Sequence, residues 1–379
     1  MALVILGAPA AWLGDLLAAV PDGMARAIVR VVDAMARIPG GHFYMAEYSG
    51  GWLLVTYGLL GAWVWRERLS IPRRRLAIAV LAAAAVFLWT SGHRAPASVR
   101  ATFLSVGSAN TNLLELPNGR TLLYDAGSSL SYARAGEGTI APALWSRGVE
   151  RIDAVFLSHA HFDHFKDVLP LVERFGVRQV FVPPTFLRRR LNIDDAVILA
   201  LLARGIEVTY FSAGDTLAGT GDVTVRGVWP RGEVGLDDDI NNGSLVLEVA
   251  DRGRRLLLTG DIEGPAIAAL IAAEPDLRAD ALLWPHHGQA SDEVRTLVHH
   301  AGAKVAVISA AGGWDLPALP AWLAADGVSC YHTGRDGAVT VELLPEGVRA
   351  EAFGGQAQAA ADAQAQRASA IGLRDPLSP

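Results

Sequence analysis

The distribution of apolar positions divides the chain into three stretches. Before about residue 92, apolar residues form long runs. From there to about residue 352 they form short runs between turn residues, and after residue 352 they follow no regular spacing. Long apolar runs are typical of membrane segments, and short alternating runs are typical of strands. We therefore predict a membrane region (residues 1–95), a globular domain (96–352) and a disordered tail (353–379), with a short Ala/Gln helix as the alternative for the tail.

The first stretch contains one amphipathic segment and two candidate membrane spans. Charges at steps of three and four from Asp22 to Arg37 predict a helix that either lies in a membrane interface or packs on a soluble core. The runs "GGWLLVTYGLLGAWVW" (residues 50–65) and "LAIAVLAAAAVFLW" (residues 76–89) carry no charge and have tryptophans near their ends, so we expect at least two transmembrane helices. We also expect the rest of a larger membrane domain to lie outside this chain.

The loop between the two runs, "RERLSIPRRR", holds five arginines. Short loops rich in arginine stay on the cytoplasmic side of a membrane. The second helix would then exit outward, so we expect a multi-pass protein of the inner (plasma) membrane whose C-terminal domain lies outside the cytoplasm.

The globular stretch alternates β-rich runs with helical patterns. Hairpin signals, such as the turn Pro117-Asn118-Gly119 between two apolar runs, dominate each half. Helical patterns lie near residues 166–174, 192–203, 265–273 and 291–300. This order predicts the α+β class, as an αββα sandwich of two mixed sheets with helices outside, rather than a parallel doubly wound sheet.

Charge and cysteine content narrow the possible functions. The net charge is −6, but the residues up to Arg94 carry nine arginines against five acids, and the remainder carries 24 basic against 34 acidic residues. A domain with a net charge of −10 has no long-range attraction for DNA, so any nucleic-acid contact has to be local or through a metal. The single cysteine, Cys330, excludes an intrachain disulfide and a Cys-based zinc site.

A dense group of potential metal ligands follows the apolar run "IDAVFL". The segment "SHAHFDH" (residues 158–164) contains His159, His161, Asp163 and His164. Imidazole and carboxylate groups suit zinc, manganese or iron, and histidines crowded this tightly are poor core residues without a metal. The segment therefore predicts a metal site at the end of a strand.

Two later strand ends carry ligands of the same kind. Asp261 ends "RLLLTGD", and His286 and His287 end "ADALLWPHH". An aspartate after a strand is by itself more often a helix cap than a ligand. Because three strand ends carry metal-type ligands, we expect the three segments to meet at one centre.

These motifs resemble the metallo-β-lactamase fold. The finer pattern "FLSVG", "ELPNGRTLLYDAG", "NNGSLVLEV", "LLLTGD" and "LLWPHHG" is similar to the C-terminal domain of ComEC-type DNA-internalisation competence proteins. The resemblance implies two divalent metal ions, zinc or manganese. It implies His159 and His161 at the first metal, Asp163 and His164 at the second, Asp261 as the bridge, and His286 as the preferred terminal ligand with His287 as the alternative.

The chain departs from this family pattern at three places. No histidine occurs between His164 and His286, so the third histidine of the first metal is absent. "SVGSAN" stands where the competence proteins have "DVGQGD", which removes two carboxylates. "HHGQAS" replaces "HHGS", which leaves Ser291 or Gln289 as the substitute for the serine.

Two adjacent cations can stabilise the entering and leaving oxygens of a phosphoryl displacement, so the resemblance implies a phosphodiesterase. Asp163 would orient or deprotonate the attacking water, and Asp261 would bridge the metals. Asn242, Ser244 and Ser291 are candidate substrate contacts, although the first two also fit turn positions. Lys166 and the arginines at 188–190 are candidates for contacts to the backbone of a single strand.

We therefore expect a membrane-anchored, extracytoplasmic nuclease domain of a DNA-uptake system. Its partners would be single-stranded DNA, the membrane and the remaining competence channel. The alternatives are a metal-dependent hydrolase of small esters or lactones, and a catalytically idle domain of the channel. The idle domain is favoured by the absent third histidine and the two absent carboxylates.

Overall fold

The computed structural model describes residues 21–35, 49–90, 94–129, 136–187, 192–232, 239–312, 320 and 322–353. The chain divides into two compact units, residues 1–45 and residues 46–379. In the first unit, residues 21–35 form one helix, in agreement with the charge spacing, and its apolar side chains are exposed. The arginines at 188–190 and most of the predicted tail lie outside the described residues.

The second unit begins with a pair of helices, α2 (Gly50–Val64) and α3 (Arg73–Thr90). The pair is joined by an edge-to-face ring contact between Trp52 and Phe87, with centroids 5.1 Å apart. Within the described ranges, no helix combines the length and the apolar character that crossing a bilayer requires. Since α2 has 15 residues and α3 opens with three arginines among its 18, the transmembrane helices predicted here are not confirmed.

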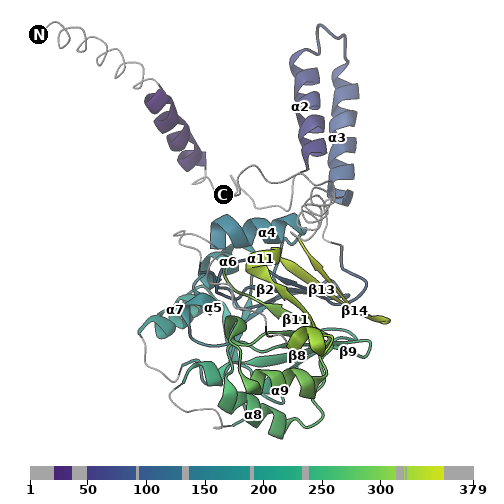
Figure 1. Ribbon diagram of the computed structural model, residues 1–379. Helices are drawn as coiled ribbons and strands as arrows, with labels where there is room; N and C mark the ends of the chain where they lie inside the picture. Colours follow the sequence, from purple (N-terminus) through teal and green to yellow (C-terminus); the bar gives the residue numbers. More distant parts are fainter. Residues whose placement is uncertain are drawn as a thin grey trace, which may run out of the picture. The chain divides into compact units, whose positions relative to one another are not determined.

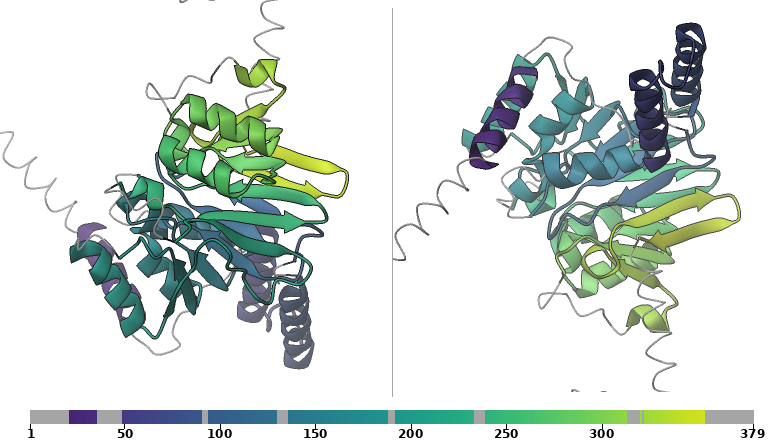
Figure 2. Two further views of the ribbon diagram at one scale, coloured as in Figure 1. Left: turned by 90° about the horizontal axis from the view of Figure 1, so that it is seen from below. Right: turned by 90° about the horizontal axis from the view of Figure 1, so that it is seen from above.

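Two β-sheets that pack face to face form the main body of the second unit (Figures 1 and 2). The first sheet has eight strands in the order β14-β13-β1-β2-β3-β4-β5-β6. Its strands are β1 (Arg100–Phe103), β2 (Asn112–Glu115), β3 (Thr121–Tyr124), β4 (Ala154–Phe156), β5 (Gln179–Val182), β6 (Glu207–Tyr210), β13 (Val339–Leu344) and β14 (Gly347–Ala352). Pairing is antiparallel from β14 to β3 and parallel from β3 to β6.

The second sheet has six strands in the order β12-β11-β10-β9-β8-β7. Its strands are β7 (Thr224–Trp229), β8 (Val246–Asp251), β9 (Arg254–Leu258), β10 (Ala281–Leu283), β11 (Val305–Ile308) and β12 (Ser329–His332). Strands β7 to β9 are antiparallel, whereas β9 to β12 are parallel. The carboxyl ends of β9 and β10 therefore lie side by side, which matters for the site.

Helices cover the outer face of each sheet (Figure 2). The helical segments of the sandwich are η1 (Gly136–Ile140), α4 (Ala141–Ser146), α5 (Phe162–Phe165), α6 (Val168–Arg174), α7 (Asn192–Ala203), η2 (Asn241–Gly243), α8 (Gly264–Ala273), η3 (His286–Gly288), α9 (Asp292–Ala301), α10 (Trp322–Ala325) and α11 (Thr333–Asp336). One apolar core lies between the sheets, a second under α4 to α7, and a third under α8 to α10. The predicted αββα sandwich of the α+β class is therefore confirmed.

Candidate metal centre

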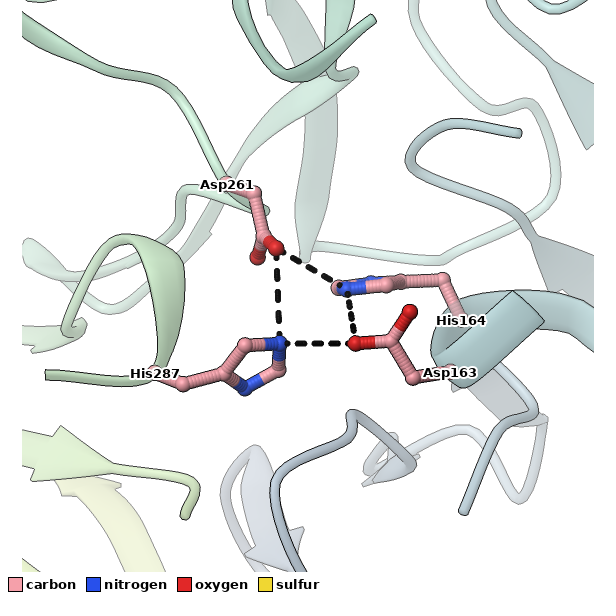
Figure 3. A group of neighbouring side chains, drawn as sticks. All are labelled: Asp163, His164, Asp261 and His287. Carbon is pink, nitrogen blue, oxygen red and sulfur yellow. Dashed lines mark hydrogen bonds and ion pairs between the residues drawn. The ribbon is translucent and has the colours of Figure 1, made fainter. Parts of the chain in front are cut away.

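Three loops at strand ends converge at one edge of the sandwich. Helix α5, which follows the loop after β4, supplies Asp163 and His164; the loop after β9 supplies Asp261, and the turn after β10 supplies His287 (Figure 3). Strand β4 belongs to the first sheet, and the neighbours β9 and β10 belong to the second. The centre thus lies where the two sheets meet, as the three strand ends predict.

The four side chains point toward a common point (Figure 3). Nε2 of His164 lies 3.1 Å from Oδ2 of Asp261, and Nε2 of His287 lies 3.3 Å from the same oxygen. Oδ2 of Asp163 lies 3.1 Å from Nε2 of His287 and 3.6 Å from Nε2 of His164. All four atoms lie within 4.8 Å of one another. Ligand atoms around a tetrahedral zinc ion are about 3.3 Å apart, so these two nitrogens and two oxygens fit a divalent cation.

Buried acceptors behind the centre fix the orientation of both imidazole rings. Oδ2 of Asp125 accepts from Nδ1 of His164 at 2.8 Å, and the backbone carbonyl of Ser309 accepts from Nδ1 of His287 at 2.8 Å. Asp125 is itself held by the backbone N–H and the hydroxyl of Ser158, at 2.6 and 2.9 Å. Because each Nδ1 carries a hydrogen, each Nε2 is the atom presented to a metal.

The charges of the four side chains balance in pairs. Burial lowers the pKa of His164, but the carboxylates of Asp261 and Asp125 outweigh it and hold the pKa well above its usual value. For His287 the same opposition, with Asp261 as the main partner, raises the pKa to about 9. Burial acts against ionisation of Asp163, but the hydrogen bond from His287 outweighs it and lowers the pKa to about 2. At neutral pH protons therefore occupy the nitrogens that a cation would bind.

A second group of potential ligands lies beside the first. Nε2 of His159 is 3.0 Å from Nδ1 of His161 and 3.9 Å from Oδ2 of Asp261. Burial lowers the pKa of His159 well below its usual value, so the ring is neutral and can act as a ligand. Oδ1 of Asp261 is buried and has no hydrogen-bond partner among the described residues. Two imidazoles and the Asp261 carboxylate could hold a second ion, with one ligand fewer than the first group offers.

The structure places His287, rather than the preferred His286, with the other three side chains. Both residues have left-handed backbone conformations, with φ of 46° and 51°. His287 faces the centre, whereas Nδ1 of His286 lies 2.9 Å from Oε1 of Glu263. This contact is close, although its geometry is not that of a hydrogen bond. His286 thus lies outside the group of four.

The three predicted substrate contacts have structural roles in the fold. Asn242 accepts a hydrogen bond from the Glu263 backbone at 3.1 Å, and Ser291 caps α9 by accepting from Val294 at 3.3 Å. Ser244 is fully buried, and its hydroxyl lies 3.2 Å from both Nδ1 of His159 and the Asp261 backbone N–H. Their role as substrate contacts stays a prediction.

The residues that orient the rings are not among the ligands predicted from the sequence. Asp125 lies in the segment "LLYDAG" directly after β3, so a carboxylate at another strand end is a usable signal. Ser158 opens the segment that carries the ligands, and its residue type alone does not indicate its role. Ser309 acts through its backbone carbonyl, which no side-chain pattern indicates.

The fold and the centre define the class of the protein. A family model described as the metallo-beta-lactamase superfamily matches residues 104–312, more than half of the chain, and the chain belongs to that superfamily. Among solved structures, CmlA, a diiron beta-hydroxylase from Streptomyces venezuelae, is 17% identical with a TM-score of 0.43, and the match covers 65% of this chain and 55% of that one.

Two curated proteins are similar in sequence to part of this chain. ComE operon protein 3 of Bacillus subtilis (strain 168) is 27% identical over 219 residues, which cover 55% of this chain. The uncharacterized protein YcaI of Escherichia coli (strain K12) is 29% identical over 243 residues, or 61% of this chain. The match spans 28% of the length of each relative. The expected similarity to ComEC-type proteins is thereby confirmed.

Proposed function

We propose that the sandwich is a metal-dependent phosphodiesterase that processes DNA in a DNA-uptake system. The observation that carries the proposal is the group of four ligand atoms, from Asp163, His164, Asp261 and His287, within 4.8 Å of one another. The motifs shared with competence proteins and the similarity to ComE operon protein 3 support DNA as the substrate. A bound divalent cation would polarise a phosphoryl oxygen and lower the pKa of water.

The side chains of the centre have distinct tasks in this proposal. Asp261 places Oδ2 3.1 Å from Nε2 of His164 and 3.9 Å from Nε2 of His159, so its carboxylate could contribute to both metal positions. Asp163 is ionised at neutral pH, and its side chain is 35% exposed, the most accessible of the four. It can therefore orient water or substrate at the open side. Asp125 and Ser309 keep the rings of His164 and His287 turned toward the centre.

The location of the domain is part of the same proposal. The arginine-rich segment 66–75, which covers the connection between α2 and α3 and the first residues of α3, supports placement of this segment on the cytoplasmic side and of the sandwich outside the cytoplasm. Reporter fusions after residue 95 test it. A fused alkaline phosphatase would be active, and a fused green fluorescent protein would be dark; the reverse pattern contradicts the placement.

A DNA-guiding domain without turnover is the second candidate. Among the described residues, only His159, His161 and the shared Asp261 are available as ligands at the first metal position. Two metals are needed to stabilise both the entering and the leaving oxygen. An incomplete first position therefore favours binding over cleavage.

One experiment separates these candidates. The full chain is loaded with Zn²⁺ or Mn²⁺, its bound metal is measured, and it is incubated with a labelled single-stranded oligonucleotide. Matched variants are Asp163→Ala at the centre and Asp222→Ala at an exposed turn before β7. Shortening by the wild type and Asp222→Ala, but not by Asp163→Ala, supports the phosphodiesterase. Bound metal and bound DNA without shortening support the second candidate, and a chain that binds no metal contradicts the first.

A further inference from the structure

Helix α5 and the residue after it carry an exposed aromatic ring and a half-buried cation beside the metal ligands. Phe162 lies between His161 and Asp163 in the chain, and its surface is 54% exposed. Its ring contacts that of Phe165 at a centroid distance of 5.4 Å. Such an exposed ring contributes little to the core and remains available to a ligand.

The helical geometry places three side chains on the same face. The backbone N–H of Lys166 donates to the carbonyl of Phe162 at 3.0 Å, which makes the two residues neighbours one turn apart. Because an α-helix turns about 100° per residue, Lys166 lies about 40° from Phe162 and about 60° from Asp163 around the axis. His164 and Phe165, which lie between Asp163 and Lys166 in the chain, are 0% and 1% exposed. The accessible part of this segment is thus Phe162, with the half-buried Lys166 and Asp163 beside it.

From this arrangement we infer that Phe162 and Lys166 form a platform for one nucleotide of a single strand, with a base stacked on the ring and a phosphate paired with the ammonium group. Aromatic side chains beside cations recognise single strands in this way, because every base has a stacking face and every nucleotide has a charge. In a duplex the base faces are already covered. The platform would set the strand so that the adjoining phosphodiester lies at Asp163.

The charge of the domain makes a local contact necessary. After Arg94 the chain carries 24 basic against 34 acidic residues, so the field around the domain repels a polyanion. A stacked base contributes binding free energy that does not depend on charge. The ammonium group of Lys166 would offset the repulsion between the phosphates of the strand and the carboxylates of the centre. The inference rests on the proposed function, since it names single-stranded nucleic acid as the substrate of the same centre.

Binding tests the platform without turnover. Fluorescence anisotropy of the full chain in EDTA compares fluorescein-labelled (dT)12 with an oligomer of equal length that lacks all its bases. The wild type should bind (dT)12 roughly tenfold more tightly than the abasic strand. Phe162→Ala should bind the two strands alike, and Phe162→Trp should restore the preference. Tyr210→Ala on the edge strand β6, with a similar exposed fraction of 56%, should keep the wild-type preference.

Salt dependence tests the cation. Lys166→Ala should make the slope of log affinity for (dT)12 against log salt shallower by about 0.7, whereas Lys166→Arg should keep the slope. A wild type that does not distinguish the strands, or a Phe162→Ala variant that still does, overturns the platform. Since these measurements need no cleavage, a metal-loaded wild type that leaves DNA intact contradicts the phosphodiesterase alone.

Discussion

Replacing Asp125 by asparagine should weaken metal binding far more than it weakens the fold. Oδ1 of Asp125 accepts from the Ser158 backbone N–H at 2.6 Å, while Oδ2 accepts from Nδ1 of His164 at 2.8 Å and from the Ser158 hydroxyl at 2.9 Å. An asparagine keeps the left-handed backbone, with φ of 61°, at little cost. Both carboxylate oxygens of Asp125 accept hydrogen bonds, whereas the amide nitrogen of an asparagine donates. The amide nitrogen therefore cannot take the place of either oxygen unless the partner facing it gives up its own hydrogen.

The orientation of the amide decides the tautomer of His164. If the amide nitrogen faces the Ser158 backbone, two donors meet at 2.6 Å. The favoured orientation places it against Nδ1 of His164, which then has to accept. The ring hydrogen that remains is then on Nε2, the atom that lies 3.1 Å from Asp261 and faces the metal. Loss of such a supporting partner typically lowers metal affinity about 10- to 100-fold.

The fold should respond less because two effects oppose each other. Weakening bonds to a charged acceptor costs about 1.5–3 kcal/mol each. Burial raises the pKa of Asp125 in spite of its contact with His164, so removing its charge relieves an unfavourable ionisation. We expect the free energy of unfolding of the metal-free chain, measured in urea, to fall by about 1–2 kcal/mol.

Competition with a chromophoric chelator measures the zinc affinity. The matched control is Asp251→Asn, which alters a buried carboxylate that accepts from the Val99 backbone at 2.9 Å, at the far end of β8. The control should lose stability and keep its affinity for zinc. Equal zinc affinities of Asp125→Asn and the wild type would refute the tautomer argument.

Four further predictions concern the same unit. Protons on His164 and His287 compete with the metal, and the pKa of His287 is raised to about 9. Zinc affinity should therefore fall as the pH decreases from 9 to 6, by about tenfold per pH unit for each proton displaced. Calorimetry in buffers of different ionisation enthalpy measures the number of protons released. His287→Ala should lower zinc affinity at least about a hundredfold and His286→Ala only a few-fold, in the chelator assay; the reverse order would contradict the assignment. Gly127→Ala should destabilise the fold by about 3 kcal/mol or more in urea, because the added Cβ would lie 1.8 Å from the Asp163 carbonyl oxygen, whereas Gly138→Ala meets nothing within 4 Å. Burial raises the pKa of Cys330 to about 12, so iodoacetamide at pH 8 should alkylate the native thiol roughly a thousandfold more slowly than the thiol in urea.

The sequence predicts the layers of the sandwich but not its last strands. The turn at Pro117-Asn118-Gly119 joins β2 and β3 as expected, because Gly119 takes φ of 85° and local chemistry determines a hairpin. Strands β12 to β14 were not predicted, although "VTVELL" alternates buried and half-buried residues in β13. Strand β13 extends the first sheet by pairing with β1, which lies more than 200 residues away in the chain. A local sequence pattern does not indicate which distant strand a segment pairs with.

The sequence likewise predicts one part of the site and not another. Residue types at strand ends sufficed to predict the meeting of three segments, because the ligands are few and chemically specific. The choice between His286 and His287 depends on which ring the turn after β10 directs to the centre, and the sequence "HHG" does not encode that direction. Asn242, Ser244 and Ser291 form hydrogen bonds within the scaffold, which no sequence pattern indicates. Their role as substrate contacts stays a prediction.

The paired charges explain how the fold can persist before a metal arrives. Isolated carboxylates and imidazoles would pay a large desolvation cost in this buried place. Here Asp261 lies between His164 and His287, and Asp163 bonds to His287, so each anion is offset by a protonated ring. Three apolar cores, rather than the ligands, hold the layers together. Occupancy of the centre should therefore depend on competition between protons and cations, while folding proceeds independently of the metal.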